Sequence, residues 1–495
     1  MNSIVLSWTD AVLDLAEALA EMPEQAYLVG GAVRDAILRR NNTDLDIVTP
    51  QNGIRLARRI ANAFQGDFYP LDETRDLGRA IIPREGGRLI IDVSGLRAGD
   101  LTGDLADRDF TVNAMAVDLT GDVSMLIDPL GGAGDLIAKR LRRCSPDALA
   151  NDPVRVLRAV RQSVQFGLHI DRETLRDMKM TVTRLSEVSP ERMRDELIKL
   201  LSLDRVQVAI RIADAIGALE VVLPELTPLH GLPQAPPHVH DGWTHSLAVV
   251  EALNDIVHTV SHKRTDDSAA QFNLGMVVIA FDRFRPALQA HLERTGTDER
   301  PRRALLMLAA LLHDTGKGLV ARELDAAGYL RYTAHEAIGA DALAARLLAL
   351  RLSNNERKYV TSLVRQHMDQ TVWQDALAPL DIYRFWRMMG EDGIDLILLS
   401  LADYLGVVGH TYNQAVWLKL IEKAQILLDG YFNQRDRLID PPALLDGEVL
   451  MQHFGLKPSP IVGGMLEAIR QSQVEGSVTN FHQAIALAGR MLRFR

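Results

Sequence analysis

The stretch from Tyr27 to Val48, "YLVGGAVRDAILRRNNTDLDIV", holds two short strand patterns on either side of a glycine pair and a helical pattern. The apolar run "AYLVG" ends at the glycines, "VRDAILRR" has helical spacing, and "TDLDIV" alternates polar with apolar residues. Strands mixed with helices predict an α/β or α+β domain. A helical pattern over residues 10–20 precedes these elements, and the mixture continues to about residue 140 through "RAIIP", "RLIIDVSG" and "AVDL".

The second strand pattern carries Asp44 and Asp46 on one face. Residues two apart in a strand point the same way with Cα atoms about 6.6 Å apart, so Leu45 between them turns toward the core. Two neighbouring carboxylates repel each other unless a cation lies between them. Hard oxygen ligands favour magnesium, which also binds substrate phosphates. The alternative interpretation of "NNTDLD" is a polar turn that leads into a strand.

The glycine pair predicts a phosphate site. Gly30 and Gly31 lie between a strand and a helix, where missing side chains let a phosphate approach backbone N–H groups. Arg34 follows within one turn and can add charge-assisted hydrogen bonds. A simple tight turn is the alternative. Asp92 in "LIIDVSG" places a third carboxylate on an apolar strand, where an unpaired charge would be costly. If the two strands are neighbours, three carboxylates converge on one metal site.

Composition bounds the class of protein. At 495 residues the chain is long enough for roughly three domains, and 47% hydrophobic with 24% charged residues is ordinary globular composition. The single cysteine, Cys144, excludes an internal disulfide framework and a cysteine-rich zinc module. The N-terminus has no basic signal-peptide region, and no apolar run is long enough for a membrane span. We expect a cytoplasmic protein with no membrane association and no obligatory protein partner.

The net charge of −10 argues against a general nucleic-acid coat. Local charge differs, because "RVLRAVR" places Arg155, Arg158 and Arg161 at three-residue intervals along a helical pattern. These cations could serve RNA or a triphosphate, or form only a solvated helix face. From about Ser145 onward the pattern is almost wholly helical. The proline-rich segment "LPELTPLHGLPQAPPH" predicts a boundary, and the polar stretch 262–303 predicts an insertion or a mobile connection.

Five motifs occur in the order "LVGGAVRD…TDLDIV", "RDFTVNAMAVD", "DPLGG", "DPVRVLRAVR" and "SPERMRDELIKLL". This series, from about residue 27 to residue 201, resembles the bacterial tRNA nucleotidyltransferase and poly(A) polymerase family, in its class II CCA-adding branch. The resemblance implies a nucleotidyltransferase head followed by a helical neck. It also implies two-metal transfer of CMP or AMP from CTP or ATP to the 3′ end of tRNA, with Mg²⁺ in the head.

The resemblance assigns roles by position. It implies a catalytic, magnesium-binding set of Asp44 and Asp46 with Asp92 as the third carboxylate. It implies a nucleotide-binding set of Gly30, Gly31 and Arg34 at the triphosphate, Arg108, Asp109 and Asn113 at the ribose, and Asp152, Arg155 and Arg158 in the neck. The family more often has arginine where this chain has Asp107, and glutamate where it has Asn151.

Asp152 and Arg155 carry the prediction of base reading. At i and i+3 on a helix their Cβ atoms would lie about 5–6 Å apart, so one acceptor and one fork of donors could bond a base edge. The alternative is structural, because an aspartate before Pro153 is also a favourable helix N-cap.

A second set of ionisable residues lies in apolar helical patterns, where desolvated charges need partners. The set is His245, His313, Asp314, His335, His367 and Asp403. Imidazole with carboxylate suits zinc, nickel, manganese or iron, and spacing does not choose among these metals. A lone core histidine is commonly only hydrogen-bonded, but six such positions weaken that interpretation.

The order His…His-Asp…His…His…Asp resembles the HD phosphohydrolase superfamily from about residue 238 to residue 406. The resemblance implies one metal bound by His245, His313, Asp314 and Asp403, and a second completed by His335 and His367. It also implies metal-dependent hydrolysis of phosphoesters, including 2′,3′-cyclic phosphates.

We therefore expect an α+β protein with a mixed-sheet head followed by helical parts. The expected domains are the nucleotidyltransferase head 1–140, the neck 141–228, the HD domain 229–410 and a helical tail 411–495. The tail either contacts tRNA or only packs. Two other functions stay open: a poly(A) polymerase, or an enzyme that adds only CC or only A. A further alternative makes the HD domain the sole catalyst, with a head that only binds.

Overall fold

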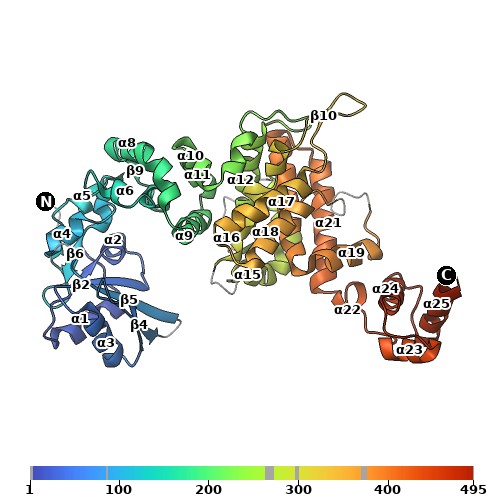
Figure 1. Ribbon diagram of the computed structural model, residues 1–495, viewed down its shortest axis with the longest axis horizontal. Coiled ribbons are helices and arrows are strands. Elements are labelled where there is room, and N and C mark those ends of the chain that lie inside the picture. The colour runs from blue at the N-terminus through green and yellow to red at the C-terminus, as the bar shows by residue number, and fades with distance from the viewer. Residues whose placement is uncertain are drawn as a thin grey trace. The chain divides into compact units, whose positions relative to one another are not determined.

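The computed structural model describes residues 4–84, 87–97, 99–261, 272–295, 300–369 and 376–493. The chain divides into two compact units, here called unit 1 (Met1–Val222) and unit 2 (Leu223–Arg495). The second unit begins where the proline-rich segment begins. Figure 1 shows strands only in the first part of unit 1, apart from short pairs farther along the chain, so the predicted α+β class is confirmed.

Unit 1 begins with a seven-stranded mixed sheet in the order β3-β4-β5-β2-β1-β6-β7. Its strands are β1 (Tyr27–Val29), β2 (Asp44–Thr49), β3 (Asp67–Asp72), β4 (Leu77–Arg84), β5 (Gly87–Gly95), β6 (Ala116–Asp118) and β7 (Leu126–Ile127). The pair β2–β5 is parallel, and its register sets Asp46 opposite Asp92. The predicted neighbouring strands are therefore confirmed, and both acids lie on one face of the sheet.

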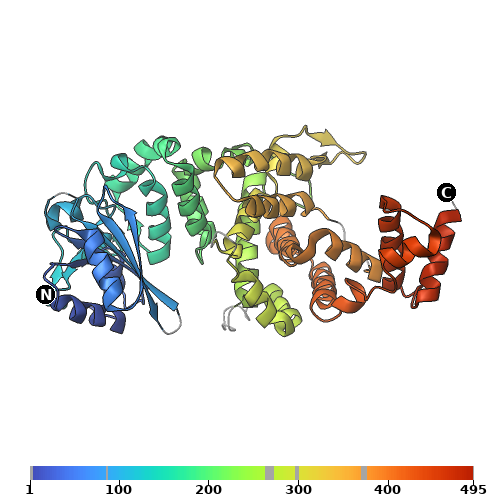
Figure 2. The ribbon, with the colours of Figure 1, turned by 60° about the horizontal axis from the view of Figure 1, so that its bottom comes forward.

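The opposite face of this sheet carries the core of the head. Leu45, Ile47, Ile91 and Val93 alternate with the acids and are almost fully buried. Helix α3 (Gly53–Ala63) packs on the outer strands, and α1 lies beside α3 (Figure 2). Helix α1 spans Asp10–Ala20, the same residues that the periodicity predicts. The alternation of β2 and β5 thus separates a dry face from an acidic face.

Further elements of unit 1 follow the strands and are mostly helical. The helices are α2 (Gly31–Ile37), α4 (Leu101–Ala106), α5 (Gly132–Ile137), α6 (Ala148–Asn151), α7 (Arg155–Phe166), α8 (Arg172–Thr181), α9 (Pro190–Leu201), α10 (Val206–Ala215) and α11 (Ala218–Val222). The short strands β8 (Arg140–Leu141) and β9 (His169–Ile170) pair in parallel beside them. Helix α7 packs on α9 and α10 and on α6.

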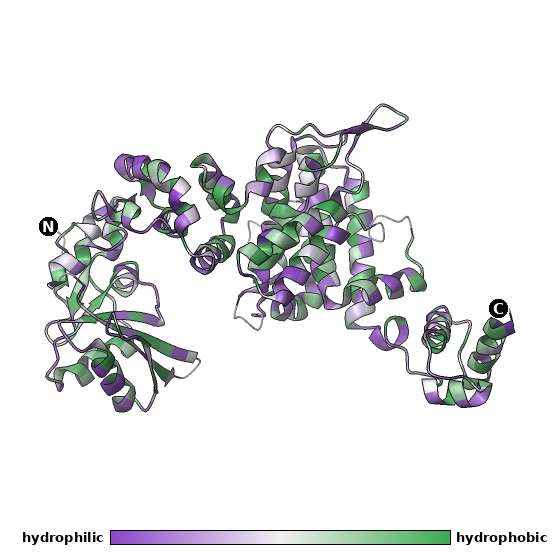
Figure 3. Ribbon diagram, viewed as in Figure 1, coloured by the Kyte–Doolittle hydropathy of each residue, from purple (hydrophilic) through white to green (hydrophobic). Residues whose placement is uncertain are grey.

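The described residues of unit 2 form helices and one hairpin. Its helices include α12 (Gly242–Ser261), α14 (Phe272–Phe281), α15 (Arg285–Leu292), α16 (Arg302–Leu312), α17 (His335–Ala349), α18 (Asn354–Gln366), α19 (Pro379–Met389), α20 (Gly393–Val408) and α21 (Gln414–Phe432). The hairpin consists of β10 (Glu323–Leu324) and β11 (Leu330–Arg331). Helix α12 packs against α14, α15, α16 and α20, and Figure 3 shows long hydrophobic stretches in the helices of this unit.

The prediction of a mobile connection over 262–303 is wrong for its central part, whereas the alternative of an insertion stays a prediction. Residues 272–295 contain α14 and α15, with Val277, Phe281 and Leu288 buried. The helical pattern of residues 272–295 was missed because polar residues flank it on both sides. Residues 262–271 and 296–299 lie outside the described residues.

Unit 2 ends in the helices α22 (Arg435–Leu438), α23 (Gly447–Phe454), α24 (Pro460–Val474) and α25 (Phe481–Arg493). The last three enclose a small core of their own that includes Leu450, Met465 and Ala484. In the part of the chain that the structure describes, no helix combines the length and the apolar character that a membrane crossing requires.

We predict that Ile91→Ala destabilises unit 1 selectively. Ile91 is fully buried in the interior strand β5, so its truncation leaves a cavity and costs about 2–5 kcal/mol. Hydrogen exchange of β5 peptides at increasing urea should show opening at lower urea, while peptides of unit 2 stay unchanged. Met125→Ala, at a position 65% exposed, is the control. An unchanged urea dependence for Ile91→Ala would contradict the assigned core.

Candidate active sites

Unit 1 contains a cleft of about 1440 Å³ above the acidic face of the sheet. Every head and neck residue that the sequence singles out lines this cleft. These residues are Gly30, Gly31, Arg34, Asp44, Asp46, Asp92, Arg108, Asp109, Asn113, Asp152, Arg155 and Arg158. Residues far apart in the sequence, from the first glycine turn to the neck helices, thus share one surface.

The three carboxylates form the floor of the cleft. Burial raises the pKa of Asp46, and the negative charges of Asp92 and Asp44 raise it further, whereas Arg108 lowers it. Water still reaches the Asp46 side chain, so the charge is partly solvated. Among the described residues, the groups of three ligand atoms within 4.8 Å of one another all lie in unit 2. The head acids share a face without closing to that separation.

Asp92 has a partner that the sequence analysis did not identify. Arg79 in β4 lies directly opposite Asp92 and donates from Nε to Oδ1 at 2.7 Å and from Nη2 to Oδ2 at 2.8 Å. The cost of an unpaired charge on this strand is therefore offset by Arg79, a cation of the protein itself. Only the antiparallel register of β4 with β5 reveals this pair, because the two residues lie 13 positions apart in the chain.

The glycine turn brings backbone close to the acids. Gly30 follows β1, precedes α2 and has φ +76°, a conformation that favours glycine. A Cβ at Gly30 would lie 3.0 Å from Arg108 Nη1 and 3.3 Å from Asp46 Oδ2. The missing side chain therefore lets a cation and an acid approach the turn, which keeps the cleft open at this point.

Arg34 is more deeply engaged in the protein than the sequence suggests. Its guanidinium donates to Asn113 Oδ1 at 2.5 Å and to Asp35 Oδ1 at 2.9 and 3.0 Å, and it lies 4.0 Å above the ring of Phe166. Burial lowers the pKa of Arg34, and the charge of Asp35 opposes this effect. Arg34 reaches the cleft wall from this buried network.

A second network joins the head to helix α7. Asp109 accepts hydrogen bonds from Asn113 Nδ2 at 2.9 Å and from Arg158 Nε at 3.0 Å. Burial alone would raise the pKa of Asp109, but Arg158 and the hydrogen bonds from Asn113 and Phe110 lower it. Arg158 also pairs with Glu196 of α9 at 3.2 Å. Arg158 therefore holds its two partners, Asp109 and Glu196, in place as ionised carboxylates.

Asp152 and Arg155 lie close together but not in the predicted arrangement. Asp152 follows α6 and precedes α7, and no side-chain cap is formed at the start of α7, so both the helical i, i+3 placement and the N-cap alternative are wrong. Asp152 Oδ2 lies 3.8 Å from Arg155 Nε and accepts from Arg192 at 2.7 Å. Arg192 also lines the cleft, and the motif "SPERMRDEL" contained it without indicating this contact.

Arg155 is anchored by backbone carbonyls. Its Nη2 donates to Asp107 O at 2.9 Å, and its Nη1 donates to Arg108 O at 3.2 Å and to Ala148 O at 3.0 Å. The carbonyls of Asp107 and Arg108 thus connect the neck arginine to the head.

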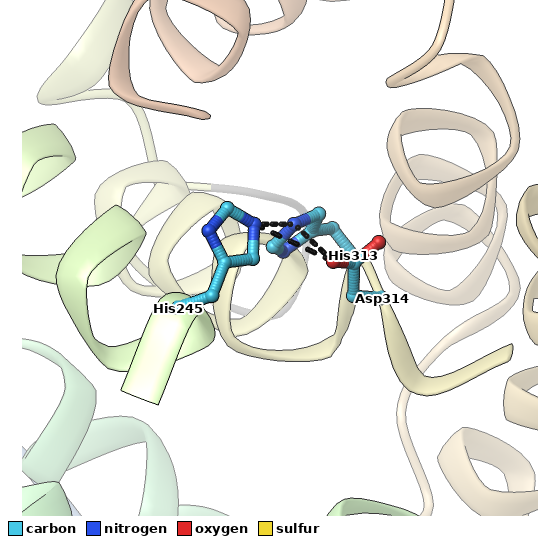
Figure 4. A group of neighbouring side chains, drawn as sticks. All are labelled: His245, His313 and Asp314. Carbon is cyan, nitrogen blue, oxygen red and sulfur yellow. Dashed lines mark hydrogen bonds and ion pairs between the residues drawn. The ribbon is translucent and has the colours of Figure 1, made fainter. Parts of the chain in front are cut away.

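The second candidate site lies inside unit 2, where the structure brings all six predicted residues together. His245 comes from α12, His313 and Asp314 follow α16, and the others come from the ends of α17 and α18 and from α20. Figure 4 shows His245 and His313 directed at each other beside Asp314. His245 Nε2 lies 3.2 Å from His313 Nε2 and 3.1 Å from Asp403 Oδ1.

Asp314 is shared between two groups of ligand atoms. Its Oδ2 lies 3.4 Å from Nε2 of both His245 and His313, and its Oδ1 lies 3.2 Å from His335 Nε2 and 3.5 Å from His367 Nε2. The two sets of atoms meet the spacing expected around a metal ion. One carboxylate therefore faces two positions for cations.

The histidines are oriented for ligation. Nδ1 donates to a backbone carbonyl in three of them, with distances of 2.8 Å for His313 to Ala310, 2.8 Å for His335 to Tyr332 and 2.7 Å for His367 to Val364. This bond fixes the tautomer that presents Nε2 as a lone pair. Nε2 of His335 and of His367 is buried without a hydrogen bond, which fits a lone pair that binds a cation.

Lys317 is a residue of this site that the sequence analysis did not identify. Its Nζ donates to Asp314 Oδ2 at 2.6 Å and to Gln234 Oε1 at 2.8 Å. Burial would raise the pKa of Asp314, but His313 and Lys317 hold it well below its ordinary value. Burial and the charges of Lys317 and His245 lower the pKa of nearby His238 to about 4. The position three residues after Asp314 is the signal that could have identified Lys317.

Family models match most of the chain in succession. They are described as Poly A polymerase head domain over residues 26–142, Probable RNA and SrmB-binding site of polymerase A over 167–229, HD domain over 242–406 and tRNA nucleotidyltransferase domain 2 over 336–488. The acidic cleft lies mainly within the first match, and the histidine cluster lies within the third.

Relatives similar to nearly the whole chain carry two different names. An A-adding tRNA nucleotidyltransferase of Deinococcus radiodurans is 30% identical and the alignment covers 95% of this chain and 96% of that protein. A CC-adding tRNA nucleotidyltransferase of Thermus thermophilus is also 30% identical, with 94% and 93% covered. A solved CCA-adding enzyme in its apo form has a similar fold, with a TM-score of 0.61, 19% identity, and 98% and 93% covered.

We predict that Asp314→Asn and His367→Ala lower the metal content of the protein to different extents. Asp314 faces both groups of ligand atoms, whereas His367 belongs to one, so Asp314→Asn should lose both bound ions and His367→Ala only one. Mass-spectrometric metal analysis after dialysis against manganese measures this difference. The exposed His453 provides the control variant His453→Ala. Two ions per chain retained by Asp314→Asn would refute the shared carboxylate.

Proposed function

The chain belongs to the tRNA nucleotidyltransferase family, and we propose that it adds CMP and AMP from CTP and ATP to the 3′ end of tRNA. As a member of this family it is a nucleotidyltransferase. Relatives of equal identity are named for CC addition and for A addition, so the order and number of nucleotides added by this chain are part of the proposal.

One observation carries the proposal: the acids of β2 and β5, the Gly30 turn and the neck residues Asp152 and Arg155 line a single cleft. A polymerase without a nucleic-acid template needs a charge site for the triphosphate and hydrogen-bonding groups for the base at one nucleotide's distance. The cleft has carboxylates at its floor and arginines in its neck wall. This combination supports nucleotide transfer better than a binding-only head.

We assign the metal-binding role to Asp44, Asp46 and Asp92, with Mg²⁺ as the expected ion. Carboxylate oxygens on one face fit a hard cation that keeps open positions for phosphate. Bound divalent ions would supply charge stabilisation to the α-phosphate and activate the RNA 3′-hydroxyl. The raised pKa of Asp46 shows that its ionised form is disfavoured without an ion, and a bound cation would stabilise that form.

The residues around the acids orient the nucleotide. Gly30 and Gly31 leave backbone exposed for the triphosphate, and the Arg108 guanidinium lies next to the turn. We assign ribose contacts to Asp109 and Asn113, and base contacts to Asp152, Arg155 and Arg158. The ion pairs of Arg158 with Asp109 and Glu196 restrict its rotation, which favours selection of one base edge over another.

The domain division that supports this assignment is a head at 1–140, a neck at 141–228, an HD domain at 229–410 and a tail at 411–495. The family matches at 26–142, 167–229 and 242–406 support the first three parts. We expect the protein to act in the cytoplasm, where its tRNA substrate is processed.

We predict that Asp44→Asn and Asp46→Asn each reduce nucleotide addition at least about 10³-fold, because each removes a carboxylate from the ion-binding face. The measurement is extension of labelled tRNA that lacks its 3′ CCA, with CTP, ATP or both supplied. Asp122→Asn, at an exposed position on a turn outside the cleft, is a matched control. Undiminished extension by either site variant would refute the assignment.

The same extension assay separates the alternatives by product length. Addition of three nucleotides from the CTP and ATP mixture indicates CCA synthesis. Addition that stops after two cytidines, or requires a tRNA that already ends in CC, indicates an enzyme for CC or for A alone. Unlimited adenosine addition indicates a poly(A) polymerase.

The histidine cluster supports a second candidate function, metal-dependent hydrolysis of phosphoesters. Two groups of Nε2 and carboxylate atoms around Asp314 fit one ion each, and the carbonyl-bonded Nδ1 atoms keep the rings in place. A bound transition metal, manganese or magnesium ion would supply an activated water. The ion-binding residues would be those of the two groups together with Asp403.

We predict that His313→Ala abolishes hydrolysis of 2′,3′-cyclic AMP while tRNA extension stays within about threefold of the wild type, because the two sites lie in different compact units. Hydrolysis is measured by chromatography with added manganese, nickel or magnesium. Asp46→Asn serves as the reciprocal control and should keep hydrolysis. Metal-dependent hydrolysis that survives in both His313→Ala and Asp314→Ala would exclude the cluster as its source.

A further inference from the structure

Arg79 and the acids of the head form one row across three strands. Asp46 of β2 lies opposite Asp92 of β5, and Asp92 lies opposite Arg79 of β4. Arg79 grips both oxygens of Asp92 with Nε and Nη2, at 2.7 and 2.8 Å. A bidentate fork of this kind fixes the orientation of a carboxylate as well as offsetting its charge.

The fork leaves Asp92 able to bind a cation. An ionised carboxylate has about four lone-pair sites, and Arg79 occupies one on each oxygen. Asp92 lines the cleft, whereas Arg79 does not. The contact of Arg79 with the lining of the cleft therefore runs through the acid that it holds.

The positive charge of Arg79 also affects how strongly the acidic face attracts divalent ions. Asp44, Asp46 and Asp92 place three negative charges on one face of the sheet, and their mutual repulsion opposes burial of Asp46. The fixed guanidinium offsets one of these charges in the ligand-free protein. A positive charge at this position also weakens the attraction of the acids for a free divalent ion.

We propose that Arg79 is a positioning residue that holds Asp92 toward the cleft and keeps the acidic face from binding divalent ions tightly before the nucleotide arrives. The inference rests on the proposed nucleotidyltransferase function and extends it to a residue outside the cleft. Geometry and charge make separate contributions, because lysine preserves the charge of arginine but cannot form the fork.

The test compares Arg79→Lys with Arg79→Gln in the full-length protein. Electron paramagnetic resonance titration with Mn²⁺, without nucleotide, measures ion affinity, and tRNA extension measures kcat. Arg79→Gln should lower the Mn²⁺ Kd about tenfold because the positive charge is lost, whereas Arg79→Lys should stay within about twofold. Both variants should lower kcat at least about tenfold, because both lose the fork.

A double-mutant comparison tests whether Arg79 acts through Asp92. Asp92→Asn alone should lower kcat, and adding Arg79→Gln to it should cause less than about a twofold further change. Equal effects of Arg79→Gln in the presence and absence of the Asp92 carboxylate would overturn the proposed route. So would an unchanged Mn²⁺ Kd in Arg79→Gln, or wild-type kcat in both Arg79 variants.

Arg84→Gln is the matched control, because Arg84 ends the same strand and pairs with Asp14 of α1 at 2.8 Å, outside the cleft. It should leave the Mn²⁺ Kd and kcat unchanged. A wrong assignment of the nucleotidyltransferase site would give a different result, namely tRNA extension that survives Asp44→Asn and Asp46→Asn. Loss of activity in those variants without any effect at Arg79 would overturn the present inference alone.

Discussion

The parallel pairing of β2 with β5 is the constraint on which the head depends. Its register sets Asp46 against Asp92 and leaves Asp44 on the same face, so the backbone brings together charges that repel one another. The residues between them, such as Leu45 and Ile91, bury the opposite face and hold the strands in that register. Hydrophobic burial on one side of the sheet thus sustains an electrostatically unfavourable surface on the other.

In both candidate sites a basic side chain of the protein offsets part of the negative charge of the carboxylates. Arg79 grips Asp92 in the head, and Lys317 donates to the shared carboxylate of Asp314 in unit 2. Neither cation requires a bound ion to be present, so each site has a defined acid geometry beforehand. The two sites differ in exposure: the head acids face an open cleft, whereas His313 and Asp314 are almost fully buried.

Local pattern predicted much of this arrangement. Strand alternation predicted the shared face of Asp44 and Asp46, and periodicity predicted the bounds of α1. The pairing of Arg79 with Asp92 was missed because it depends on the register between strands. The predicted helical position of Asp152 was wrong because α6 ends immediately before it and α7 begins three residues later. The predicted N-cap was wrong because no side chain caps the start of α7, although an aspartate followed by proline commonly does so.

The hydrogen bonds of Arg155 connect movements of the neck with movements of the head. Its guanidinium is held by the carbonyls of Asp107 and Arg108, and the latter residue approaches the Gly30 turn. A base that accepts from this guanidinium shares it with those carbonyls, because arginine has five N–H donors. In the nucleotidyltransferase function proposed above, a shift of Arg155 on binding a base would move the segment that carries Arg108 toward or away from the Gly30 turn. A mismatched base would then lose its own hydrogen bonds and also displace the phosphates of its nucleotide.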